Sequence, residues 1–264
     1  TPTSQGVTLG QVIALANQKG GVAKTTTTLN LAVAFKEQGF NVLAVDLDPQ
    51  GNLTMSQGMD PDTVERSMFD VLVHSLPIDE VIHRTEIDLA VSSIDLAGAE
   101  LALSSMIGRE RALQKGLLPA RNRYDYVLVD TPPSLGLLTI NALTAADSVI
   151  VPVQCEYLSL RGLVQLENTL SMIRENLNPT VEIRGILPTM YDGRTLHSRT
   201  AGRSRAARPK RRRSASVRTK KASTAALPRA MIRNCRKKRF SWKIADSTGV
   251  ELSGGSRLET GQDV

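Results

Sequence analysis

The chain has few cysteines, few aromatic residues and no long apolar run, and each shortage excludes a class of protein. Its two cysteines, Cys155 and Cys235, have no metal-ligand spacing and cannot form a disulfide framework, so we expect a cytosolic protein. No apolar stretch approaches the roughly 20 residues that a membrane-spanning helix needs. Aromatic residues make up 3% of the chain and hydrophobic residues 41%, which suits the aliphatic interior of an α/β protein.

Basic residues are scarce in the first three quarters of the chain and crowded in the last. Residues 1–198 contain 14 Lys and Arg against 22 Asp and Glu, a net charge of −8. Residues 199–264 contain 19 Lys and Arg against 4 Asp and Glu, a net charge of +15. We therefore predict an acidic, enzyme-like domain over residues 1–198 and a basic, irregular segment over residues 199–264.

An apolar strand and a helix follow each other near the start of the chain, joined by a glycine-rich loop. Val12–Ala16 has the composition of a strand buried on both faces of a parallel sheet. The stretch from Lys24 to Gln38 places Leu29 and Val33 at helical spacing, and Gly39 supplies a stop. The loop therefore ends at a helix N-terminus, where the dipole and free N–H groups favour an anion.

The loop itself has the chemistry of a phosphate site. Gly20 and Gly21 permit positive φ angles and let backbone N–H groups approach an anion closely. Lys24 adds a full charge toward the β- and γ-phosphates, and Thr25 offers a hydroxyl to Mg²⁺. The residues expected to bind the nucleotide are Gly20, Gly21, Val22, Ala23, Lys24, Thr25 and Thr26.

Aspartates stand at the ends of two further apolar strands, predicted at 41–46 and 124–130. The carboxyl ends of parallel strands are where ligands bind. Asp46 and Asp48 alternate along an extended backbone and so point in opposite directions. Asp130 is placed to accept hydrogen bonds from Mg²⁺-bound water, and residues 131–136 follow it as a loop that senses the nucleotide.

Strands and helices alternate through the rest of the acidic part. Residues 93–103 lead into a further predicted helix, with Leu101, Met106 and Leu113 available to the core. The other predicted elements are helices at 64–73, 137–146 and 159–176 and strands at 88–91, 148–153 and 181–187. This alternation predicts an α/β fold with a doubly wound, mostly parallel sheet.

Three motifs carry a family resemblance: Lys19-Gly-Gly-Val-Ala-Lys-Thr-Thr26, Asp46-Leu-Asp-Pro49 and Asp130-Thr-Pro-Pro133. Together they resemble the deviant Walker A loop and partner motifs of the ParA/MinD superfamily, in particular the ParA/Soj-type partition ATPases. The generic Walker A pattern does not match, because Gln18 and Ala23 occupy its two glycine positions. The resemblance covers about residues 10–198 and implies a P-loop NTPase fold with ATP and Mg²⁺ as cofactors.

The resemblance also implies roles for single residues. Lys19 corresponds to the signature lysine, which in the family reaches the phosphates of the nucleotide bound by the other subunit of an ATP-sandwich homodimer. Asp48 corresponds to the aspartate that positions or activates the attacking water, with Lys19 and Lys24 as the other catalytic residues. Asp46 takes either a Mg²⁺-water role or a structural one. The residues expected at the Mg²⁺ site are Thr25, Asp46 and Asp130.

The segment after the last predicted strand resembles the family's base-binding end. Pro188 and Met190 are accordingly expected to contact adenine, with plain loop packing as the alternative.

The function implied is ATP-dependent DNA partition of a chromosome or plasmid. The protein would dimerise on ATP, bind DNA nonspecifically and hydrolyse ATP when a ParB-like partner stimulates it, in the cytoplasm at the nucleoid. A MinD-like membrane-cycling ATPase is one alternative, but residues 199–264 contain no amphipathic helix with a clear apolar face, so no membrane partner is expected. A hydrolysis-incompetent product that binds nucleic acid through its tail is another.

The resemblance ends at Ser198. Residues 199–239 contain hardly an aliphatic residue and no sustained period of 3.6 or 2. Two explanations remain open. One is a shifted reading frame in a GC-rich gene, and the other is a basic arm that neutralises nucleic-acid phosphates.

Overall fold

Short apolar runs build the centre of the first of two units, residues 1–202 and 203–264, into which the chain divides. The computed structural model describes residues 9–154, 159–190, 240–245 and 251–256. Cys155, Cys235 and the basic stretch 199–239 lie outside these ranges.

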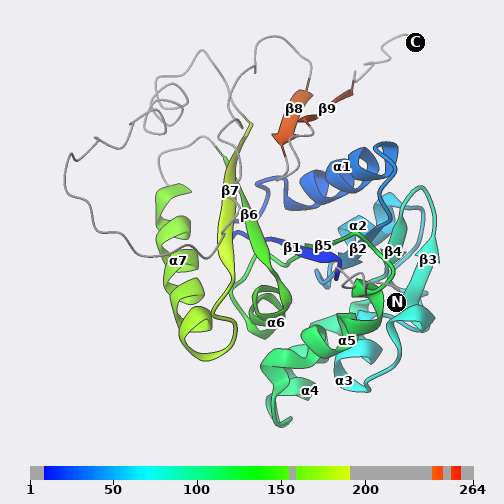
Figure 1. Ribbon diagram of the computed structural model, residues 1–264. Helices are drawn as coiled ribbons and strands as arrows, with labels where there is room; N and C mark the ends of the chain where they lie inside the picture. Colours follow the sequence, from blue (N-terminus) through cyan, green and yellow to red (C-terminus); the bar gives the residue numbers. More distant parts are fainter. Residues whose placement is uncertain (1–8, 155–158, 191–239, 246–250, 257–264) are drawn as a thin grey trace, which may run out of the picture. The chain divides into compact units, whose positions relative to one another are not determined.

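A seven-stranded sheet forms the first unit, with the strand order β3-β4-β2-β5-β1-β6-β7 (Figure 1). Six of these strands are parallel, and β3 runs antiparallel to β4 at the edge. The strands are β1 (Gln11–Leu15), β2 (Val42–Asp46), β3 (Ile82–Arg84), β4 (Asp88–Ala90), β5 (Tyr126–Asp130), β6 (Ser148–Gln154) and β7 (Glu182–Thr189). The predicted mostly parallel α/β sheet is confirmed.

Helices lie on both faces of this sheet, with α1 over the central strands on one face and α5 and α6 on the other (Figure 1). The helices are α1 (Lys24–Glu37), α2 (Asn52–Ser56), α3 (Met68–Val73), α4 (Ala99–Ser104), α5 (Ala112–Arg121), α6 (Leu137–Ala145) and α7 (Ser159–Asn176). Short 3-10 turns are η1 (Ile78–Val81), η2 (Ile94–Gly98) and η3 (Arg109–Arg111). None of the helices described is both long and apolar enough to cross a membrane.

Alternate residues of the central strands supply one face of the core. These residues are Val12, Ala14, Leu43, Val45, Val127, Val129, Val149 and Val151, and all belong to one buried cluster with residues of α3 to α7. The register places Asp46 beside Asp130, and Asp130 beside Leu15. The carboxyl ends of β2, β5 and β1 therefore lie side by side, where the phosphate loop begins.

Some predicted helices differ in length or in the face they bury. The helix predicted over 64–73 begins only at Met68, because Ser67 and Asp70 form a capping box that starts it there. The helix predicted to follow residues 93–103 is not continuous, because this part of the chain forms η2, α4, η3 and α5. Leu113 is fully buried, but Leu101 is 81% exposed, so its assignment to the core was wrong.

The second unit contains a two-stranded antiparallel sheet of β8 (Phe240–Ala245) and β9 (Glu251–Ser256). These two strands follow the basic stretch 199–239 and were not among the predicted elements. Their sequence signal is short: Phe240, Trp242 and Ile244 alternate with other residues at the period of a strand.

Candidate nucleotide site

The loop between β1 and α1 turns on two residues in the left-handed region. Gly21 has a φ of 69° and Ala23, the N-cap of α1, has a φ of 67°. Of the two glycines that permit a positive φ, only Gly21 adopts one. A Cβ at Gly20 would instead lie 3.6 Å from Cβ of Pro133, so the phosphate loop passes close to the loop after β5.

Hydrogen bonds anchor this loop to β6 and β7. Asn17 Nδ2 donates to a backbone carbonyl of β6 at 2.6 Å, and Asn17 Oδ1 accepts from the backbone N–H of Lys19 at 3.0 Å. Thr189 Oγ1, at the end of β7, donates to the carbonyl of Val22 at 3.1 Å. Lys19 Nζ donates to Gln154 Oε1 of β6 at 2.8 Å. The loop shape is therefore fixed by the neighbouring strands.

Lys24 lies among buried carboxylates. It is 7% exposed, as is Asp48, and Asp130 is fully buried. Burial lowers the pKa of Lys24, while the charges of Asp130 and then Asp48 act to raise it. The structure thus brings the loop lysine and two of the three predicted aspartates into one electrostatic group.

Asp130 has a carboxylate that its own environment leaves incompletely satisfied. Its Oδ1 accepts a long hydrogen bond of 3.4 Å from Thr28 Oγ1. Its Oδ2 is buried and has no hydrogen-bond partner among the described residues. Burial raises the pKa of Asp130 to about 7, opposed by a hydrogen bond from Thr25 and reinforced by the charge of Asp46. A buried carboxylate with a spare oxygen is suited to an additional hydrogen-bond donor.

Asp46 contrasts with Asp130, because both of its oxygens are already occupied. Its Oδ1 accepts from the N–H of Asp48 at 3.1 Å. Its Oδ2 accepts from the N–H and the hydroxyl of Thr54 at 2.9 and 2.8 Å. Burial raises the pKa of Asp46 to about 6, and the hydrogen bonds from Thr54 and Asp48 limit this rise.

Pro188 and Met190 flank Thr189 at the end of β7 and both are exposed. Met190 has a φ of 51° and an exposed fraction of 57%. Their predicted contact with adenine stays a prediction.

Sequence reasoning missed several residues that shape the site: Asn17, Thr28, Thr54, Ser92 and Thr189. Each is a buried amide or hydroxyl side chain at or near a strand end or in the first turns of a helix. That position is the only signal that the sequence offered for them.

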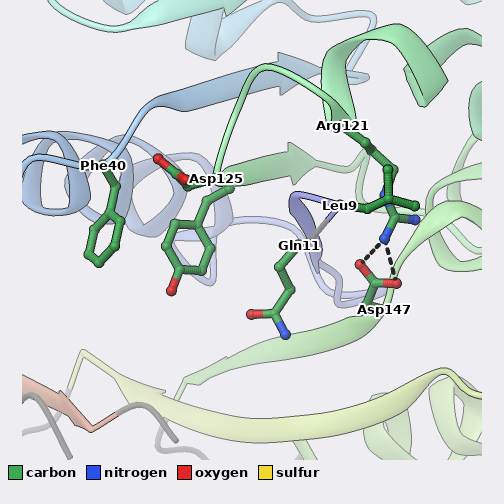
Figure 2. A pocket seen from close by; sticks show the side chains of 7 residues that line it. Leu9, Gln11, Phe40, Arg121, Asp125 and Asp147 are labelled. Carbon is green, nitrogen blue, oxygen red and sulfur yellow. Dashed lines mark hydrogen bonds and ion pairs between the residues drawn. The ribbon is translucent and has the colours of Figure 1, made fainter. Parts of the chain in front are cut away.

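A separate hollow of about 530 Å³ lies at the opposite, amino end of the strands (Figure 2). Its lining residues are Leu9, Gln11, Phe40, Arg121, Asp125, Tyr126 and Asp147. Figure 2 shows Arg121 paired with Asp147, at 2.9 and 3.0 Å. Gln11 accepts from Arg184, and Asp125 accepts from the N–H of Asn41. Its polar groups are thus already paired, unlike Asp130 in the candidate site.

The described residues contain no cluster of three or more His, Cys, Asp or Glu that could hold a metal ion by themselves. Mg²⁺ in nucleotide sites is usually bound through substrate phosphates, waters and one or two protein oxygens.

Comparisons with known proteins agree with this geometry. Residues 10–183 match a family model described as AAA domain. The sporulation initiation inhibitor protein Soj of Bacillus subtilis (strain 168) is 48% identical over 190 residues, covering 71% of this chain and 75% of Soj. The chromosome partitioning protein ParA of Myxococcus xanthus (strain DK1622) is 45% identical over 190 residues, covering 71% and 67%.

A solved structure shows the same architecture with ligands bound. It is described as cobyrinic acid a,c-diamide synthase from Mycobacterium smegmatis with an ATP analogue and magnesium. It is 48% identical, with a TM-score of 0.72, and the match covers 76% of this chain and 84% of that chain.

Proposed function

This chain belongs to the ParA/Soj family of partition ATPases, and we propose that it is an Mg²⁺-dependent ATPase that segregates DNA. In this proposal it dimerises on ATP, binds DNA nonspecifically and hydrolyses ATP when a ParB-like partner stimulates it. The protein then works in the cytoplasm at the nucleoid.

The convergence of Lys24, Asp48 and Asp130 beneath the phosphate loop carries the proposal. Lys24 is buried between two carboxylates, a position that suits a counter-charge to the β- and γ-phosphates. The loop also ends at the N-terminus of the 14-residue helix α1, whose free N–H groups favour phosphate. No other role explains a buried lysine at this position so simply.

The residues present fit a magnesium ion bound with ATP. Thr25 is placed to offer its hydroxyl, and the spare Oδ2 of Asp130 is suited to accept a hydrogen bond from a coordinated water. Mg²⁺ neutralises phosphate charge and helps to orient the γ-phosphate for in-line attack.

Each catalytic residue then has a distinct task. Lys24 stabilises the charge that develops on the transferred phosphoryl group. Asp48 orients the attacking water, and Lys19 reaches the phosphates of the nucleotide in the partner subunit of the dimer. In this chain Lys19 Nζ donates to Gln154 Oε1.

ATP hydrolysis by the full chain tests the proposal, with and without DNA, on protein first shown to be monodisperse. We expect Lys24→Ala to lower turnover at least 100-fold, because the phosphates lose their buried counter-charge. Lys36→Ala is the matched control, since Lys36 lies in the last turn of α1 and donates to the carbonyl of Glu86. Turnover that Lys24→Ala leaves unchanged would remove the ATPase assignment.

A further inference from the structure

Four buried residues form a closed ring of hydrogen bonds around the loop that follows β2. The N–H of Asp48 donates to Asp46 Oδ1 at 3.1 Å, and Thr54 Oγ1 donates to Asp46 Oδ2 at 2.8 Å. The N–H of Ser92 donates to Thr54 Oγ1 at 3.0 Å, and Ser92 Oγ donates to the carbonyl of Asp48 at 2.7 Å. Every hydroxyl in the ring donates once, so its directions are consistent.

The ring joins β2 and the helix that follows it to a residue far along the chain, just after β4. Asp46 is the last residue of β2, Thr54 lies in α2, and Ser92 follows the end of β4. All three are fully buried, and Asp48 is 7% exposed. A buried network in which every member is satisfied rigidifies its surroundings.

The backbone of Asp48 is the part of the loop that the ring clamps. Its N–H is held by Asp46, and its carbonyl accepts from both Ser92 Oγ and the N–H of Gly51, the latter at 2.8 Å. Its side chain is not a member of the ring: Asp48 Oδ1 accepts only from the N–H of Gln50, at 3.1 Å, among the hydrogen bonds of the described residues. The ring therefore fixes the backbone position from which the Asp48 side chain extends, and none of its hydrogen bonds is made to the Asp48 carboxylate.

We propose that Thr54 and Ser92 are positioning residues for ATP hydrolysis, which hold the backbone of Asp48 so that its carboxylate meets the attacking water. Asp46 is the common acceptor of this ring, through both of its carboxylate oxygens. The proposal rests on the proposed function, which gives Asp48 its task. A displacement of about 1 Å at a reacting group can cost about 100-fold in rate, so a clamp of this kind has catalytic value.

A positioning role and a merely structural role predict different kinetics. If the ring only stabilised the fold, its loss would lower the melting temperature and ATP binding together. If the ring positions Asp48, its loss lowers kcat while KM for ATP changes little, because the phosphate loop is anchored independently through β6 and β7.

Steady-state hydrolysis by full-length variants separates the two roles. Thr54→Val removes the hydroxyl with little change of shape, Ser92→Ala removes the donor to Asp48, and Thr54→Ser restores the hydroxyl. Thr169→Val is the matched control, because Thr169 is a 9% exposed threonine of α7 whose hydroxyl donates to Gln165. Melting temperature is recorded for every variant.

We expect Thr54→Val and Ser92→Ala each to lower kcat about tenfold with KM within about twofold of wild type. Thr54→Ser and Thr169→Val should stay within about twofold of wild-type kcat. Unchanged kcat in Thr54→Val and Ser92→Ala, beside activity that Lys24→Ala abolishes, overturns this proposal alone. Losses that Thr54→Ser fails to rescue also overturn it, and activity indifferent to Lys24→Ala overturns the proposed function with it.

Discussion

Ala23 occupies a backbone conformation that suits glycine better than alanine. Its φ of 67° places its backbone in the left-handed region, a conformation that costs an L-residue about 1–2 kcal/mol because of its Cβ. Glycine relieves this strain, but it also increases the conformational entropy of the unfolded chain. We expect Ala23→Gly to raise the free energy of unfolding by about 1 kcal/mol before the opposing entropy effect is subtracted. Urea unfolding of the nucleotide-free protein measures this, and a decrease would show that the strain argument is wrong.

Asp130 links the site to pH. Burial raises its pKa from 3.8 to about 7, so the folded protein holds the proton more tightly than the unfolded chain does. Its contribution to stability is therefore complete below about pH 4 and is lost as the pH rises through about 7. At pH 8 the Asp130 carboxylate of the nucleotide-free protein is therefore charged and buried, and its Oδ2 has no hydrogen-bond partner among the described residues.

Asp130→Asn tests this linkage, because asparagine is neutral at every pH. We expect the variant to exceed wild type in unfolding free energy by the order of 2 kcal/mol at pH 8, and by clearly less at pH 5.5. Urea unfolding at both pH values measures the difference. A difference that does not depend on pH, or that grows as the pH falls, contradicts the assignment. Asp62→Asn, at an exposed position, is the control.

Local chemistry made Lys24 and the loop glycines predictable, whereas the ring residues were not. The residues of the phosphate loop are consecutive in the sequence, so an apolar strand followed by two glycines and a lysine is enough to locate the loop. Thr54 and Ser92 meet only through folding, 38 positions apart, and neither belongs to a recognisable pattern. Ala23 was recognised as a departure from the generic motif, but its positive φ required the structure.

At the level of elements, Asp147 ties the amino ends of two strands to a helix. It accepts from the N–H of Val12 in β1 at 2.7 Å and from Arg121, the last residue of α5, at 2.9 Å. Arg121 also donates to the carbonyl of Gly10 at 3.0 Å. This junction lies at the amino ends of the strands, opposite the carboxyl ends where the phosphate loop begins.

We expect Asp147→Ala to lower the free energy of unfolding by about 2 kcal/mol, because Val12 N–H and Arg121 lose their shared acceptor. The side chain is about one third exposed, so water compensates part of the loss. Affinity for ATP should stay within about twofold of wild type. Thermal unfolding together with nucleotide titration checks both, and an equal loss of binding would show that the two ends of the sheet are coupled.

Elements with a long, regular pattern were predicted almost to the residue, as α7 and the central strands show. The errors fell where short elements depend on side-chain contacts. The side-chain cap of Ser67 sets the start of α3 at Met68, and Leu101 lies on the exposed side of α4, which is only six residues long. The three-residue edge strand β3 has no periodicity that a sequence could reveal.

The whole molecule joins an acidic ATPase unit to a strongly basic segment. If residues 199–264 act as a DNA-binding arm, each phosphate they neutralise adds about −0.9 to the slope of log affinity against log salt. Replacing Arg208, Lys210, Arg211, Arg212 and Arg213 together by Gln should therefore make the slope shallower by up to about 4.5. Fluorescence anisotropy with duplex DNA, at salt concentrations from about 50 to about 200 mM, measures it.

An unchanged slope would assign DNA binding to the ATPase unit instead. Sequencing the coding DNA around codon 199 tests the other explanation of this segment. A single-base insertion or deletion that restores a family-like C-terminus would establish the shifted frame, and its absence would dismiss it.

Titration calorimetry with Mg²⁺-ATP tests the central claim most directly, that the loop from Lys19 to Thr26 is a nucleotide site. We expect wild type and Lys36→Ala to bind with Kd values within about twofold of each other, and Lys24→Ala to bind at least tenfold more weakly. Omitting Mg²⁺ should weaken binding to wild type. Equal binding by wild type and Lys24→Ala would contradict the account.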